Sequence, residues 1–374
     1  MEAAPTGAAV ARLGHCTSAG WAADGIGPNC TYVGRRQWHR STLLVGSCAR
    51  NVRSALEQHA QAWITSLLDT ASAGNTDGVG ALIFEDEQRS GDPDGTRAAL
   101  RAWAVRDTRI RLMLAQPLLY PRWSRTQRLA LCRNMIAYEA ARLPDKGVYL
   151  ALDLDCHTPP APEVLAVVTQ RLLAPASSWD VLTSNTRQPS LYYDRWALRS
   201  RTLTLDYDCW FNATERRARG SCTEYAITID PTAALFAVES AFNGLGLYRA
   251  AAVRTALDAQ CRYRGTKNSY LCEHVPFHVC MGQQRLRIGV LPSLLTSCGP
   301  TSVTARPVRV EMHANGSVQV HDHRPPVPPP KPKAPRQAKA SSRRGSRGTR
   351  VAKTSAGSQT ATPSSGSARR VRLR

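Results

Sequence analysis

Short apolar runs alternate with helix-like segments through the first half of the chain, and this alternation limits the folds that it can adopt. The runs at residues 42–46, 78–84 and 148–152 are rich in Val, Leu and Ala and lie between Gly, polar or charged residues, which predicts buried strands. Residues 52–70 and 126–143 carry apolar side chains at helical spacing. The pattern predicts an α/β domain whose sheet is mostly parallel and flanked by helices.

The composition changes sharply near the end of the chain. Residues 324–374 contain 14 Lys and Arg and no Asp or Glu, and the whole chain has a net charge of +21. A Pro-rich stretch followed by Ser, Gly, Arg and Lys cannot bury a core, so we expect a disordered basic tail. This tail could bind nucleic acid or another polyanion, or act only as a solvated segment. The expected divisions are an irregular lead-in, a folded domain, a short extension and the tail, at residues 1–40, 41–300, 301–322 and 323–374.

The cysteines and the hydropathy of the sequence indicate whether the chain binds structural zinc and whether it crosses a membrane. Eleven cysteines are scattered along the chain and none forms a CxxC pair, which argues against a structural zinc module and leaves buried, reduced thiols as the default. No apolar run approaches the roughly 18 residues of a membrane span, and the N-terminus lacks the pattern of a signal peptide. We therefore expect a cytoplasmic protein with no transmembrane segment, with the Golgi lumen as the alternative. Three glycosylation sequons, which matter only in a secreted chain, begin at Asn29, Asn212 and Asn315.

Two carboxylates, Asp153 and Asp155, follow the apolar run at 148–152 directly. In an extended chain, residues i and i+2 lie on the same side, and the carboxyl end of a parallel strand faces the crevice where ligands bind. Mg²⁺ and Mn²⁺ take few carboxylates and share the remaining positions with phosphate and water. The pattern predicts a divalent cation site with Asp155 as the direct ligand and Asp153 as its support or a ribose contact. A solvated turn is the alternative, because D-x-D is a common sequence.

Several short motifs follow one another in a fixed order. They are IFEDEQRSGDPDGT at residues 83–96, Arg133-Asn134, the D-x-D pair, and YDRWALR at residues 193–199. In this order they resemble the GT-A nucleotide-sugar glycosyltransferases, in particular the fungal capsule-associated α-1,3-mannosyltransferase family. The resemblance covers residues 42–295. It implies a Rossmann-like GT-A fold and a metal-dependent transfer of a hexose, such as mannose, from a GDP or UDP sugar to a glycan or glycoprotein acceptor.

The resemblance also implies a third metal ligand near the end of the domain. His274 and His278 are the candidates, and we expect His274 to lie in a loop stiffened by Pro276. Imidazole is an acceptable ligand for Mn²⁺, although oxygen is preferred. The alternative for both histidines is an ordinary position in the core or at the surface.

Residues after the first two strands are expected to contact the nucleotide, because the crevice of a parallel sheet forms there. Ser47 and Arg50 follow the first strand, and Glu85 and Asp86, which could accept hydrogen bonds from the base or ribose, follow the second. Arg133 could pair with a phosphate through its planar guanidinium. A solvated surface position is the alternative for the charged residues.

The base for the transfer is left open among three carboxylates. An inverting enzyme needs a carboxylate near the acceptor hydroxyl, and Asp194, Glu239 and Glu273 are the candidates. A retaining enzyme needs no such base. The rival hypotheses are a non-catalytic protein with a transferase-like fold whose tail binds a polyanion, and a nucleotidyltransferase. The nucleotidyltransferase hypothesis would need a Gly-rich, Arg-containing loop after the first strand to bind a nucleoside triphosphate, and the sequence has none there.

Overall fold

The fold was analysed in a computed structural model. It describes residues 14–16, 30–31, 42–73, 78–85, 92–114, 123–156, 158–187, 190–203, 225–267, 271–298 and 308–322. The expected basic tail at 323–374 and most of the expected lead-in lie outside the described residues, so both remain predictions.

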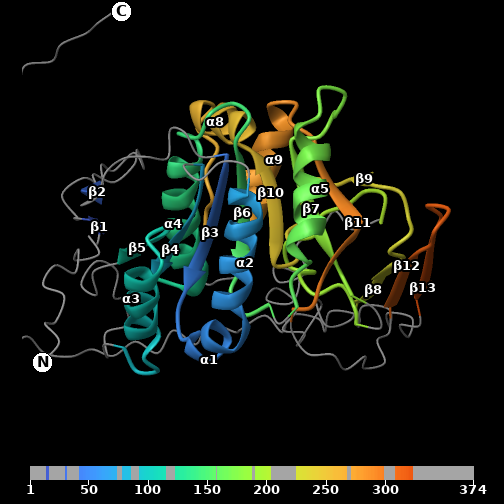
Figure 1. The fold of residues 1–374 in the computed structure, drawn as a ribbon. Helices are drawn as coiled ribbons and strands as arrows, with labels where there is room; N and C mark the ends of the chain where they lie inside the picture. Colours follow the sequence, from blue (N-terminus) through green and yellow to red (C-terminus); the bar gives the residue numbers. More distant parts are fainter. Residues whose placement is uncertain are drawn as a thin grey trace, which may run out of the picture. The chain divides into compact units, whose positions relative to one another are not determined.

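A central sheet organises the described part of the chain (Figure 1). In spatial order its strands are β2 (Cys30–Thr31), β1 (Gly14–Cys16), β5 (Ile110–Leu114), β4 (Val79–Glu85), β3 (Leu43–Ala49), β6 (Val148–Asp153), β10 (Leu245–Arg249), β7 (Val181–Thr186), β11 (Ile288–Thr296) and β9 (Phe236–Ala237). The run from β1 to β6 is parallel throughout. β10 is antiparallel to both β6 and β7, and β7 is parallel to β11. The predicted α/β fold with a mostly parallel sheet flanked by helices is confirmed.

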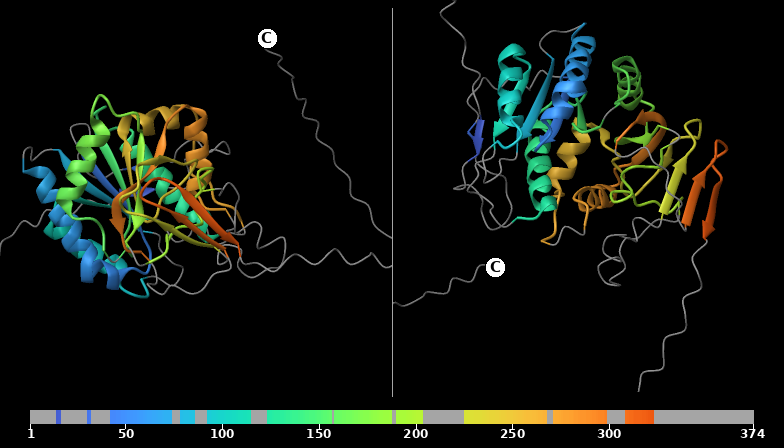
Figure 2. Two further views of the ribbon diagram at one scale, coloured as in Figure 1. Left: turned by 90° about the vertical axis from the view of Figure 1, so that its right-hand side faces the viewer. Right: turned by 90° about the horizontal axis from the view of Figure 1, so that it is seen from below.

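Helices cover both faces of the sheet, as Figure 2 shows. One face packs against α2 (Gln61–Ser72), α3 (Thr96–Arg106) and α5 (Pro162–Leu173), and α2 is preceded by α1 (Arg53–Ala55) and a π-helical turn (Leu56–Ala60). The other face packs against α4 (Arg125–Ala140), α8 (Ala250–Asp258) and α9 (His274–Gln283).

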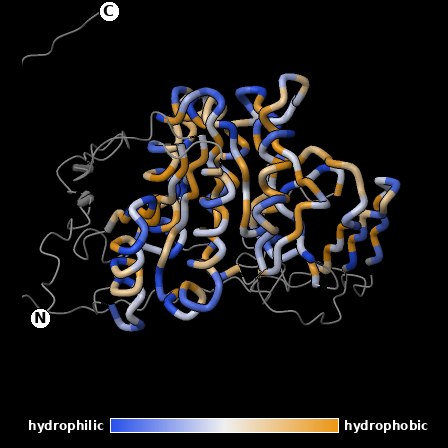
Figure 3. The backbone as a smooth tube through the Cα atoms, viewed as in Figure 1, coloured by the Kyte–Doolittle hydropathy of each residue, from blue (hydrophilic) through white to orange (hydrophobic). Residues whose placement is uncertain are grey.

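Alternation along β3 shows how one strand serves both cores. Leu43 and Val45 belong to the cluster under α2, whereas Leu44 belongs to the cluster under α4. Successive side chains of a strand point to opposite faces, so a strand buried on both faces reads as a continuous apolar run. In Figure 3 the central strands are accordingly hydrophobic along most of their length.

A smaller sheet contains the described part, residues 308–322, of the extension predicted at 301–322. β12 (Val308–Met312) pairs in parallel with β8 (Tyr225–Ile229) and antiparallel with β13 (Val318–Asp322). The extension thus supplies two strands that pair with a strand from within the predicted domain.

One central strand, β10, was not predicted from the sequence. β10 contains Gly246 and follows Gly244, and glycine lowers strand propensity. Gly244 has a φ of +81°, and a Cβ there would lie 2.3 Å from the sulfur of Cys156 and 2.4 Å from that of Cys298. The glycine is therefore required by its neighbours and by its backbone conformation.

The loop expected around His274 is also wrong, because α9 begins at that residue. Pro276 is the third residue of the helix, where its missing N–H would have no partner within the helix anyway. The proline therefore marks a helix start.

Among the described residues, three disulfides form where the sequence favoured reduced thiols, whereas Cys272 is a buried free thiol. The disulfides join Cys48 to Cys132, Cys156 to Cys298, and Cys261 to Cys280. The first two join residues 84 and 142 positions apart, so the spacing of the cysteines in the sequence did not predict these pairs. Within the described ranges, no helix has the length and apolar character needed to cross a membrane.

Candidate functional site

A cavity of about 490 Å³ lies where β3 and β6 end. Its walls are formed by residues 48–52 at the end of β3, residues 153–155 at the end of β6, one face of α4, the segment 193–196, and residues 272–274 at the start of α9. The carboxyl ends of adjacent parallel strands are where α/β proteins bind ligands. The predicted crevice is therefore a real cavity in the structure.

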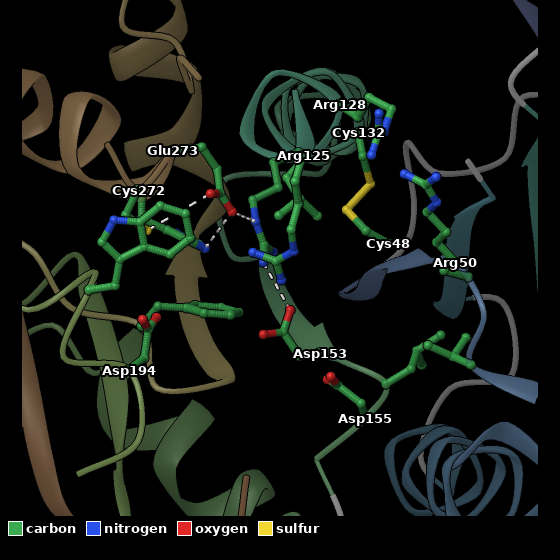
Figure 4. A pocket seen from close by; sticks show the side chains of 18 of the residues that line it. Cys48, Arg50, Arg125, Arg128, Cys132, Asp153, Asp155, Asp194, Cys272 and Glu273 are labelled. Carbon is green, nitrogen blue, oxygen red and sulfur yellow. Dashed lines mark hydrogen bonds and ion pairs between the residues drawn. A yellow bond between two sulfur atoms is a disulfide. The ribbon is translucent and has the colours of Figure 1, made fainter. Parts of the chain in front are cut away.

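Charge is divided between the two sides of this cavity. Figure 4 shows Arg50 and Arg128 on one side, Asp194 and Glu273 on the opposite side, and Asp153 between them. Such an arrangement fits a ligand with an anionic part and an uncharged, hydrogen-bonding part.

Arg133 forms the centre of the carboxylate side. Its Nη2 donates to Asp153 Oδ1 at 2.9 Å and its Nε donates to Glu273 Oε1 at 2.9 Å, while the guanidinium lies 4.5 Å above the ring of Phe242. Burial opposes the charge, but Asp153 and then Glu273 outweigh it and hold the pKa of Arg133 well above its ordinary value. Arg133, expected to contact a phosphate, thus bridges two carboxylates and fixes their positions.

Asp153 and Asp155 both line the cavity, as the D-x-D pattern predicted. Asp153 is the last residue of β6 and its side chain is 27% exposed, and Asp155 lies in the exposed turn that follows. Two carboxylates at a cavity wall fit a Mg²⁺ or Mn²⁺ ion that takes its other ligands from phosphate and water. Among the described residues, no group of three or more His, Cys, Asp or Glu side chains could hold the ion by itself.

The two candidate histidines occupy different environments. His278 does not line the cavity, and its ring accepts or donates hydrogen bonds at both nitrogens, to Tyr248 Oη at 2.8 Å and to Ser240 Oγ at 3.2 Å. Burial, and then Arg133, lower the pKa of His278 to about 3. His274 lines the cavity and is 1% exposed, and burial lowers its pKa well below 6.5. The two rings do not converge on one position in the cavity.

Asp194 is the one of the three proposed bases that stands at the cavity wall without an ion pair to Arg133. Its Oδ1 accepts a hydrogen bond from the Ala197 N–H at 3.1 Å. Burial, and then the neighbouring charge of Asp153, raise the pKa of Asp194 from 3.8 to about 7. A carboxylate with a pKa near neutrality suits proton transfer at physiological pH.

Asn243 holds the segment that carries Asp194. Its Oδ1 accepts hydrogen bonds from the N–H groups of Tyr193 at 3.0 Å and Asp194 at 3.2 Å, and from Thr186 Oγ1 at 3.1 Å. Asn243 has a φ of +57°, in the left-handed region that asparagine tolerates better than most residues. The segment is thereby tied to the end of β7.

Three other predicted nucleotide or catalytic residues, Ser47, Glu85 and Glu239, lie away from the cavity. Ser47 Oγ donates to the Leu152 carbonyl at 2.8 Å, which ties β3 to β6. Glu85 is buried and accepts from Arg97 Nε at 2.8 Å, and Glu239 pairs with Arg201 at 2.9 Å. None of these side chains lines the cavity. Asp86 lies outside the described residues.

The sequence reading missed five contributors to the cavity wall: Arg125, Arg128, Tyr193, Phe242 and the Cys48–Cys132 disulfide. Arg125 and Arg128 lie on α4 three residues apart, so they are neighbours on its surface, but such a pair is too common on helices to mark a site from the sequence. Tyr193 lines the same cavity, where burial, and then Asp153 and Asp155, raise its pKa and Arg125 lowers it.

Comparisons with known proteins give distant structural likenesses. No protein family and no curated protein matches the sequence. The chain is similar to a solved 4-diphosphocytidyl-2C-methyl-D-erythritol synthase at 8% identity and a TM-score of 0.33, over 72% of this chain and 94% of that chain. It is also similar to the galactosyltransferase LgtC, solved in complex with donor and acceptor sugar analogues, at 11% identity and a TM-score of 0.30, over 66% and 72% of the two chains. Neither likeness identifies a function.

Proposed function

We propose that the chain is a glycosyltransferase that binds a nucleoside-diphosphate sugar in the cavity and transfers the hexose to a hydroxyl group of a glycan or glycoprotein. The observation that carries the proposal is the division of charge at the carboxyl ends of β3 and β6. Arg50 and Arg128 occupy one side and Asp194 and Glu273 the other, with Asp153 and Asp155 between them. The motif resemblance supports mannose as the hexose and GDP or UDP as the leaving group.

The arginine side suits the diphosphate. Negative charge grows on the leaving nucleoside diphosphate as the bond to the sugar breaks, and groups aimed at that charge lower the barrier. Arg50 and Arg128 line this side, and Arg125 lies between it and the carboxylates. A guanidinium group can bind two phosphate oxygens at once. Asp153 and Asp155 would hold Mg²⁺ or Mn²⁺, which supplies Lewis-acid stabilisation of the same charge when bound.

The carboxylate side suits the sugar and the acceptor. Sugar hydroxyls donate to carboxylates, and the apolar face of a sugar ring packs on an aromatic side chain such as Trp196, which lines the cavity. In an inverting reaction, Asp194 would accept the proton of the acceptor hydroxyl. Glu273 is held by Arg133 and would position the groups on the carboxylate side of the cavity. Glu239 has no role in the proposed chemistry because it does not line the cavity.

A thermal-shift panel tests the proposal. UDP, GDP, UDP-glucose and GDP-mannose are added to the full chain with and without MnCl₂, because a ligand of the native state raises the melting temperature. We expect either UDP and UDP-glucose or GDP and GDP-mannose to raise the melting temperature. The Arg125→Ala variant should need about ten times the ligand concentration for the same shift. Arg101→Ala, on the exposed side of α3, is the matched control and should respond like the wild type. If no nucleotide shifts the melting temperature, the proposal fails.

A further inference from the structure

One buried side chain in the cavity wall lacks the hydrogen bonds that burial normally requires. Neither Nδ1 nor Nε2 of His274 has a hydrogen-bond partner among the described residues, although the side chain is 1% exposed. Buried polar atoms in native proteins are nearly always paired, and those that are not call for an explanation such as a bound ligand. Because His274 lines the cavity, a ligand there can supply the partner.

The ring of His274 is held in one orientation by its aromatic neighbours. It stacks on Phe242 with centroids 4.0 Å apart and an interplanar angle of 20°, and Tyr263 meets it edge-on at 5.3 Å and 86°. The nearest carboxylate atom, Glu273 Oε1, lies 3.8 Å from Nε2, beyond hydrogen-bond distance, and already accepts from Arg133. The ring nitrogens are therefore presented at fixed positions and cannot readily turn toward another partner.

The chemistry of the ring selects the kind of ligand. A neutral imidazole offers one donor and one acceptor. The charged guanidinium of Arg133 also lies over the ring of Phe242, on which His274 stacks. A hydroxyl group, which both donates and accepts, matches such a ring. A phosphate, which only accepts when ionised, matches it less well than it matches the arginines on the opposite side of the cavity.

We propose that His274 hydrogen-bonds a hydroxyl group of the hexose in the donor and thereby helps to decide which sugar the cavity accepts. The inference rests on the proposed function and adds a residue that contacts the sugar of the donor, whereas the arginines contact its diphosphate. It replaces the role of third metal ligand that the motif resemblance implied for this histidine. A site that hydrogen-bonds a hydroxyl rejects analogues without it, because its buried polar groups are then left unpaired.

The test separates the sugar from the nucleotide. Calorimetric titrations of the full chain with MnCl₂ use UDP and UDP-glucose, and GDP and GDP-mannose, on the wild type and on His274→Phe and His274→Gln. Phenylalanine keeps the stack on Phe242 and removes both nitrogens. We expect His274→Phe to leave the Kd of the nucleoside diphosphate within twofold and to raise that of the nucleotide sugar about tenfold, with part of the loss recovered in His274→Gln.

His278→Phe is the matched control, because His278 is equally buried but has both nitrogens bonded. It should lower the melting temperature by leaving Ser240 and Tyr248 without their partner, whereas His274→Phe should not. If His274→Phe raises the Kd of the nucleoside diphosphate and that of the nucleotide sugar equally, and does so only with MnCl₂, the histidine is a metal ligand. That result would overturn the proposal. Unchanged Kd values would overturn it as well. In both cases nucleotide binding by the wild type leaves the proposed function standing, whereas a wild type that binds no nucleotide defeats both.

Discussion

Arg133 donates a 2.9 Å hydrogen bond to Asp153, the residue at which β6 ends. Its second bond, to Glu273, ties the same guanidinium to the residue that precedes α9. A single buried cation thus connects α4, the end of β6 and the start of α9. The first carboxylate of the D-x-D pair therefore faces the cavity in a fixed orientation.

Removing this cation should destabilise the fold. Arg133→Met leaves Asp153 and Glu273 without their partner, and breaking a buried ion pair in this way costs about 3–5 kcal/mol. Arg133→Lys should recover little, because an ammonium group cannot reproduce the two directed bonds of the guanidinium. Urea denaturation measures the difference, with Arg101→Ala as a control expected to stay within about 0.5 kcal/mol of the wild type. A loss below about 1 kcal/mol in Arg133→Met would contradict the bridging role.

The raised pKa of Asp194 predicts a pH-dependent stability difference. The unfolded carboxyl ionises near its ordinary pKa of 3.8 and the folded one at about 7, so between these values the folded state binds more protons and the free energy of unfolding falls as pH rises. Asp153 and Glu273 face Asp194 as repelling charges, and Arg133 partly offsets them. Asp194→Asn, which can still accept from Ala197, should match the wild type near pH 3.5 and exceed it at pH 8 by at most about 4 kcal/mol.

Urea denaturation of both proteins at pH 3.5, 6 and 8 checks this prediction. Other titrating groups are common to the two proteins and cancel in the difference. A difference that stays constant with pH would show that Asp194 does not titrate in this range.

The Cys48–Cys132 disulfide should support both stability and ligand binding. It joins residues 84 positions apart and lies in the cavity wall. Cys48 comes just before Arg50 in the sequence, and Cys132 comes immediately before Arg133. Replacing both cysteines by alanine should cost about 2–4 kcal/mol and raise the Kd of the nucleoside diphosphate. The Cys261–Cys280 pair lies outside the cavity lining, so its double alanine variant should lose stability without a change in Kd. Equal Kd values in the two variants would contradict a role for the first disulfide in shaping the site.

The proposed metal dependence of the transfer should require Asp155. Asp155→Asn removes one carboxylate ligand, and the stabilisation that a divalent ion provides amounts to several kcal/mol, so we expect turnover with MnCl₂ to fall about 100-fold or more. Asp258→Asn, an exposed change at the end of α8, serves as the control. Wild-type turnover in Asp155→Asn, measured as nucleoside diphosphate released, would remove Asp155 from the metal site.

The parts of the fold that depend on local pattern were predictable from the sequence. The strand that ends at Asp153 is a run of apolar residues bounded by Gly147 and the carboxylates, so both its existence and its end could be inferred. β10 could not, because Gly246 lowers its strand propensity and Gly244, just before it, makes a close approach to the Cys156–Cys298 disulfide, which is a tertiary feature.

The site was predictable only where residues lie close together in the sequence. Asp153 and Asp155 share one strand end, and both line the cavity. His274 and His278 are four residues apart on α9, yet only the structure separates the one at the cavity from the one bonded to Tyr248. Arg125 is an exposed arginine on a helix, which has no distinguishing pattern until α4 is placed against β6.

The products of the reaction test the central claim most directly. The full chain is incubated with MnCl₂, GDP-mannose or UDP-glucose and a mixture of glycan acceptors, and separately with GTP or UTP and a sugar 1-phosphate. The account predicts release of a nucleoside diphosphate in equal amount to the glycosylated acceptor, and its loss in Asp155→Asn. Release of pyrophosphate from the triphosphate, with no nucleoside diphosphate from either sugar donor, would contradict it.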